Sequence, residues 1–220
     1  MMGGLDGTFP MQAHAQSTLT PDAALAALSE GNRRFMAGKL IAHEQDLTVL
    51  KQHTEEKQEP FAAVLSCADS RVPVELVFDQ SIGHIFVTRV AGNIITPEII
   101  GSLEYGAAVL GTKVILVMGH SNCGAVKATI QGKEVPGQIS SLFPHIQPGV
   151  DQGGPNLEAA TKANAQIQAH RIAAVRHLPL AKVEELISQN TDNRSLGVLG
   201  EPGVNVLELN ISLEEEAPLK

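Results

Sequence analysis

The stretch FAAVLSCADSRVPVELVF, residues 61–78, holds the first clue to the fold of this chain. Residues 61–67 form a short continuous apolar run, which is typical of a β-strand covered on both faces. The run stops at Cys67, and Asp69 and Arg71 follow at two-residue steps. Because the chain has only two cysteines, one of them beside an acid and a base at a strand end indicates a functional site.

Strand-like and helix-like segments alternate on both sides of this stretch. Residues 85–90 are strand-like, and residues 114–118 form a second fully apolar strand. Helices are predicted to begin at Thr20-Pro21 and at Thr96-Pro97. This alternation predicts an α/β fold with a mostly parallel central sheet flanked by helices and preceded by an N-terminal helical arm.

The other segments have the following predictions. Helices are expected after Pro73, from Cys123 to Gly132, and over 157–175 and 181–189; residues 43–59 are expected to be partly helical, 136–155 to form a loop, and 195–211 to form two strands joined by a turn. The domain prediction is a mobile N-terminal arm over residues 1–19 and a single α/β domain over 20–220.

Composition excludes several classes of function. Hydrophobic residues make up 43% of the 220 residues and charged residues 18%, as in an ordinary globular protein. The net charge of −8 argues against nucleic-acid binding, which needs clustered Lys and Arg. No segment has the apolar length that is needed to span a membrane.

Three side chains of metal-binding type are predicted to meet at one edge of the sheet. Cys67 follows one apolar strand, His120 follows another, and Cys123 comes three residues later, near a helix N-terminus. In open α/β sheets, ligands bind beyond the carboxyl ends of the strands. Thiolate and imidazole suit tetrahedral zinc, and three protein ligands leave one position open for catalysis. The alternative is that both cysteines are buried apolar residues and the histidine is structural.

Four motifs add a resemblance to a known family. They are CADSRVP, RVAGN, SLEYG and GHSNCGAV, which begin at residues 67, 89, 102 and 119. In type, order and separation they are similar to the motifs of β-class carbonic anhydrases. The resemblance implies a homodimer or a multiple of dimers, one Zn²⁺ per subunit on Cys67, His120 and Cys123, and the reaction of CO2 with water to give bicarbonate and a proton.

The resemblance also implies roles for residues around the metal. Gln58 would bind a substrate oxygen across the dimer interface, while Phe86, Ala91 and Tyr105 would line the pocket or its mouth. His84 stands where relatives commonly carry an acid, and a proton shuttle there is one hypothesis. The C-terminal region departs from the family pattern, because residues 197–210 contain no tyrosine.

The two charged residues after Cys67 have a chemical role that can be argued directly. Zinc lowers the pKa of bound water and so supplies hydroxide near neutral pH. Asp69 is placed to accept a hydrogen bond from that hydroxide, and Arg71 can hold Asp69 ionised in a bidentate pair.

The alternatives to carbonic anhydrase activity are hydrolysis of COS or CS2 on the same scaffold, or a non-catalytic zinc-binding relative. Two metal-bound thiolates indicate a reducing cytoplasm, or a microcompartment within it.

Overall fold

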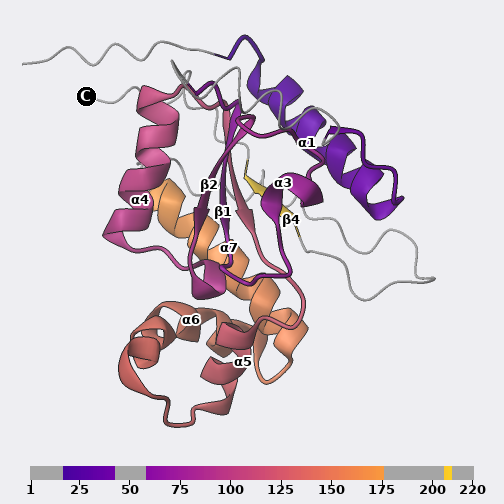
Figure 1. Cartoon of the computed structure of the whole chain (residues 1–220). Coiled ribbons are helices and arrows are strands. Elements are labelled where there is room, and N and C mark those ends of the chain that lie inside the picture. The colour runs from indigo at the N-terminus through magenta and orange to yellow at the C-terminus, as the bar shows by residue number, and fades with distance from the viewer. Residues whose placement is uncertain (1–16, 43–57, 176–205, 210–220) are drawn as a thin grey trace, which may run out of the picture.

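A four-stranded sheet forms the centre of the molecule (Figure 1). The computed structural model describes residues 17–42, 58–175 and 206–209. In the described chain the strand order is β2-β1-β3-β4. Strands β1 (Ala62–Ser66), β2 (Ile85–Arg89) and β3 (Val114–Met118) are parallel, and β4 (Val206–Leu209) pairs antiparallel with β3. The predicted α/β fold with a mostly parallel sheet is confirmed.

The two central strands are apolar because helices cover both of their faces. All five residues of β1 and of β3 are buried. Alternate residues point to opposite faces: Leu65 packs in a cluster with residues of α4 and α7, whereas Val64 packs in a cluster with residues of α1 and α3. Figure 1 shows these two pairs of helices on either side of the sheet. The helices are α1 (Pro21–Met36), α3 (Val74–Val77), α4 (Pro97–Glu104), α5 (Gly124–Gln131), α6 (Phe143–Gly153) and α7 (Leu157–Val175).

Short turns connect these elements at three places. A 3₁₀ turn covers Ala91–Asn93, a π-type turn over Tyr105–Val109 continues α4, and another 3₁₀ turn covers Gly137–Leu142. The predicted helix starts are confirmed for α1, where the Thr20 hydroxyl accepts a hydrogen bond from the Ala23 amide, and for α4 at Pro97. Helix α5 ends at Gly132, whose φ of 59° is left-handed.

The prediction of a loop over residues 136–155 was wrong. The structure has a 3₁₀ turn and then α6 in this segment. Two of the residues that suggested a loop, Pro144 and Gly149, fit this helix. Pro144 lies at the start of α6, where its missing N–H has no intrahelical partner to lose. A Cβ on Gly149 would lie 2.8 Å or less from backbone and side-chain atoms of Asn164, so glycine allows α6 to pack closely on α7.

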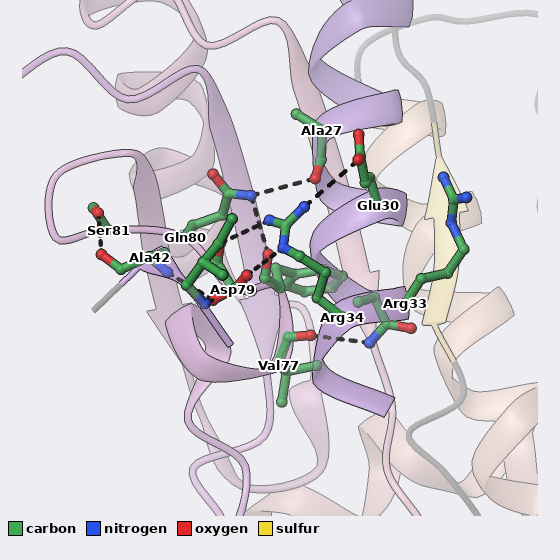
Figure 2. Close-up of polar contacts among 12 residues, drawn as sticks. Ala27, Glu30, Arg33, Arg34, Ala42, Val77, Asp79, Gln80 and Ser81 are labelled. Carbon is green, nitrogen blue, oxygen red and sulfur yellow. Dashed lines mark hydrogen bonds and ion pairs between the residues drawn. The ribbon is translucent and has the colours of Figure 1, made fainter. Parts of the chain in front are cut away.

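A buried ion pair attaches α1 to the body of the protein (Figure 2). The Asp79 side chain is fully buried and pairs with the Arg34 guanidinium of α1. Its other oxygen accepts hydrogen bonds from the backbone amides of Ile41 and Ala42, each 3.0 Å long. Burial raises the pKa of the Asp79 carboxyl, but these donors outweigh it and hold that pKa below its usual value.

Several predictions fall outside the described residues. These are the partial helix in 43–57, the helix over 181–189, the first strand and turn of 195–211, and the arm over residues 1–16. The division into an arm and one domain therefore stays a prediction. No helix in the described part of the chain is long and apolar enough to cross a membrane.

Candidate metal centre

The ends of two central strands bring three metal-binding side chains together. Cys67 directly follows β1, His120 lies two residues after β3, and Cys123 is the N-cap residue of α5. All three are buried, and their ligand atoms lie within 4.8 Å of one another. The predicted convergence at the carboxyl edge of the sheet is confirmed. It favours a metal site over the alternative of two cysteines buried as apolar residues beside a structural histidine.

The orientation of His120 suits a metal ligand. Its Nδ1 lies 2.9 Å from the Ser121 carbonyl oxygen. Because a carbonyl only accepts, Nδ1 carries a proton, and Nε2 is the nitrogen that offers a lone pair in the neutral ring. This Nε2 is buried and has no hydrogen-bond partner among the described residues. A buried nitrogen lone pair without a partner, beside two sulfurs, is what a zinc ligand needs.

The two thiols also suit a divalent cation. Hydrogen bonding from the Cys123 thiol lowers the pKa of Cys67 to about 4, helped by the Gly92 amide, which donates to Cys67 Sγ at 3.3 Å. The same bond to Cys67, together with burial, raises the pKa of Cys123. Cys67 is therefore the more readily ionised of the two thiols, which favours binding of a cation. Two sulfurs and one nitrogen fit tetrahedral zinc with a fourth position left for water or substrate.

Asp69 and Arg71 form a bidentate pair at the edge of this group. Arg71 Nε donates to Asp69 Oδ1 at 2.9 Å, and Nη2 donates to Oδ2 at 2.8 Å. These bonds hold the pKa of the Asp69 carboxyl well below its usual range. Asp69 Oδ2 also lies 3.9 Å from His120 Nε2, so an ionised carboxylate stands beside the metal ligands.

Arg89 holds the loop between Cys67 and Asp69, and sequence reasoning assigned it no role. Its Nε donates to the Cys67 carbonyl at 2.9 Å, and its Nη2 donates to the Asp69 carbonyl. In β2, it is opposite Ser66, the last residue of β1. The sequence did offer one signal for this role. Arg89 is a charged residue at the end of β2, and β2 pairs with β1, the strand that leads to Cys67.

Two buried amides of α7 were also missed. Asn164 and Gln168 have no solvent exposure, and Asn164 Nδ2 donates to the Gly92 carbonyl at 2.9 Å. The signal in the sequence was a pair of polar residues four apart on the buried face of a helix.

Comparison with known proteins assigns the family. Residues 62–201 match the model of the family described as carbonic anhydrase. The chain belongs to the β-class carbonic anhydrase family. Carbonic anhydrase 2 of Mycobacterium tuberculosis is 34% identical over 184 residues, which cover 82% of this chain and 86% of that protein. The carbonic anhydrase of Mycolicibacterium smegmatis is 40% identical over 134 residues, 59% of this chain and 65% of that protein.

A solved structure agrees. The Coccomyxa β-carbonic anhydrase has 27% identity to this chain and a TM-score of 0.51, over 68% of this chain and 72% of that one. Membership brings carbonic anhydrase activity, and Cys67, His120 and Cys123 form a zinc site of the kind typical of this family.

One shorter match is to a protein that is not named as a carbonic anhydrase. The potassium-transporting ATPase KdpC subunit 1 of Nostoc is 52% identical to this chain over 79 residues, which cover 36% of this chain and 32% of that subunit. This match covers much less of the chain than the carbonic anhydrases of the mycobacteria do.

Within one chain of this carbonic anhydrase, the residues predicted to bind substrate separate into two groups. Ala91 is next to Gly92, which contacts Cys67. Phe86 pairs in register with Ala63 at the amino end of β1, and its ring lies 6.1 Å from that of Tyr105.

Gln58 comes before β1 begins, and His84 comes just before β2. Strands rise about 3.3 Å per residue. Gln58, Phe86, Tyr105 and His84 are therefore at the opposite end of the strands from the metal ligands of their own chain. The proton-shuttle role of His84 stays a prediction.

Proposed function

We propose that this chain hydrates CO2 reversibly to bicarbonate and a proton at the site formed by Cys67, His120 and Cys123. The observation that carries the proposal is the buried Cys2His group with an ionised carboxylate at its edge. When bound there, zinc would supply activated water by lowering its pKa towards neutrality. The roles below belong to the protein's own residues.

Asp69 is proposed to accept a hydrogen bond at the open side of the metal site. Its low pKa keeps it ionised at neutral pH, so it can only accept, and it orients whichever group donates to it. Arg71 holds both carboxylate oxygens and so keeps Asp69 from turning towards the metal. A zinc site that served folding alone would not need this pair.

The walls for CO2 are proposed to come from two copies of the chain. CO2 is apolar, so its pocket needs apolar surface beside one or two hydrogen-bond donors. Ala91 is close to the metal ligands of its own chain. Gln58, Phe86 and Tyr105 are too far along the strands, so they would serve the site of a second copy. The half-exposed Tyr105 ring is available for such a contact.

The cellular compartment is also a proposal. The metal ligands include two thiols that must stay reduced to bind a cation, which favours a reducing cytoplasm or a microcompartment within it.

Stopped-flow measurement with pure zinc-loaded protein tests this function. We expect rapid hydration of CO2, with much slower turnover of COS and CS2. Faster turnover of COS or CS2 than of CO2 would change the substrate assignment. A full zinc complement with no turnover of any of the three would leave only a zinc-binding role.

A further inference from the structure

A buried polar network on α7 supports the backbone next to the metal ligands. Asn164 Oδ1 accepts a hydrogen bond from Gln168 Nε2 at 2.9 Å. Gln168 Oε1 accepts from the Ile95 amide at 3.0 Å and from Arg171 Nη1 at 3.1 Å. Together with the bond from Asn164 to Gly92, the network holds both ends of segment 92–95.

Gly92 is the point where this network reaches the metal centre. Its carbonyl accepts from Asn164 Nδ2, and its amide donates to Cys67 Sγ. Its φ of 76° is left-handed, and a Cβ there would lie 2.7 Å from Ile146 Cδ1. The residue is therefore held from three sides. Its N–H and its carbonyl lie in adjacent peptide planes that share the Gly92 Cα, so fixing the carbonyl restricts the rotation that would turn the N–H away from the sulfur.

A hydrogen bond to a ligand sulfur changes how that sulfur binds a cation. An N–H donor draws negative charge away from the sulfur and fixes its position, and such outer contacts commonly alter metal affinity by 10- to 100-fold. We propose that Asn164 is a positioning residue of the metal centre, which acts through the Gly92 backbone on the Cys67 sulfur. The inference rests on the Cys–His–Cys site and not on the identity of the substrate.

The Asn164→Ala variant tests this inference with readouts that do not depend on turnover. We expect its zinc dissociation constant, measured by competition with a chelating indicator, to rise about 10-fold, because losing the fixed position of the sulfur weakens binding more than the regained charge strengthens it. In cobalt-substituted protein, the thiolate-to-cobalt charge-transfer band should move to lower energy, because the sulfur lone pair rises in energy when the N–H no longer points at it. Gln168→Met should move both readouts in the same direction by a smaller amount.

Asn32 of α1 provides a matched control. Its Nδ2 also donates to a backbone carbonyl of a distant segment, that of Val77, at 3.0 Å. Asn32→Ala should therefore cost stability without changing zinc affinity or the cobalt spectrum. The inference is overturned if Asn164→Ala keeps the parental affinity and spectrum, or if Asn32→Ala changes both equally. If Asn164→Ala does not fold, Gln168→Met decides by the same criteria. Neither of these results would contradict the proposed hydration of CO2, because that activity is measured in a separate experiment.

Discussion

At the residue scale, two side chains in the loop after β1 have different hydrogen-bond partners. They are Cys67 and Asp69, two residues apart. The Cys67 sulfur interacts with Cys123 and the Gly92 amide, while the Asp69 carboxylate interacts with Arg71. Arg89 fixes the backbone carbonyls of both residues. The loop thus sets a metal ligand and a hydrogen-bond acceptor in one fixed relation.

Replacing Asp69 by Asn should reduce CO2 hydration by about 10²-fold, of the order seen when a positioned electrostatic group is removed. The change keeps the size of the side chain but removes its charge. Zinc should remain at one per chain, because the three ligands are unchanged. Stopped-flow kinetics and metal analysis of the same sample check both parts. Loss of zinc together with activity would make Asp69 a structural residue instead.

Replacing Arg71 by Ala should lower activity by another route. The freed carboxylate would be able to occupy the open metal position, so azide should bind cobalt-substituted Arg71→Ala more weakly than it binds the cobalt parent. The double variant Arg71→Ala with Asp69→Asn should recover azide binding. Absorption spectra with and without azide measure this. If Arg71→Ala binds azide and hydrates CO2 as the parent does, Arg71 does not keep Asp69 away from the metal.

At the scale of elements, a buried carboxylate helps to hold α1 on the body of the protein. Asp79 joins Arg34 of α1 to the amides of residues 41 and 42 (Figure 2). Because the pKa of Asp79 is lowered in the folded protein, its contribution to stability is complete above the unfolded-state pKa of about 3.9. That contribution is lost as the pH falls through the lower folded-state pKa.

The variant Asp79→Asn should therefore lose about 3 kcal/mol of unfolding free energy at pH 7, as when one partner of a buried ion pair is removed. Urea titrations should show the difference from the parent shrinking as the pH falls below about 4. The control is Glu30→Gln, since Glu30 pairs with the same arginine at 3.8 Å but is largely exposed. That change should cost less than about 1 kcal/mol. Equal losses in both variants would contradict the role of Asp79.

Sequence patterns predicted elements well where the determinants are local. Strands β1 and β3 were found because continuous apolar runs mark strands covered on both faces. Helix α7 was found because residues 157–175 contain no glycine or proline to interrupt a helix. Helix α6 was missed because Gly149 serves a close contact with Asn164, and such a contact depends on a distant segment. In the site, ligands at strand ends were predictable. Arg89 and Asn164 were not, because each acts on the backbone of residues far away in the chain.

At the scale of the whole molecule, one chain holds only part of the proposed catalytic machinery. The metal ligands are at the carboxyl ends of the strands, and Gln58 lies before the amino end of β1. A second copy must supply the missing donor if Gln58 contacts substrate, so activity should depend on assembly into dimers.

Mixing two inactive variants tests this dependence. Gln58→Ala should bind zinc but turn over slowly, and Cys67→Ala should lose zinc. Dimers that contain one chain of each kind would have one site with both intact groups, so the mixture should regain measurable CO2 hydration after subunit exchange. Exchange itself is verified with affinity tags of two kinds. Mixed dimers that form but stay inactive would reject the placement of Gln58 across the interface.

The most direct test of the central claim is CO2 hydration by protein stripped of zinc and then reloaded, beside His120→Ala treated in the same way. The account predicts that the stripped parent is inactive and regains hydration as zinc approaches one per chain, whereas His120→Ala regains neither metal nor activity. A stripped parent that still hydrates CO2 at the full rate, or a His120→Ala variant that retains zinc and activity, would contradict it.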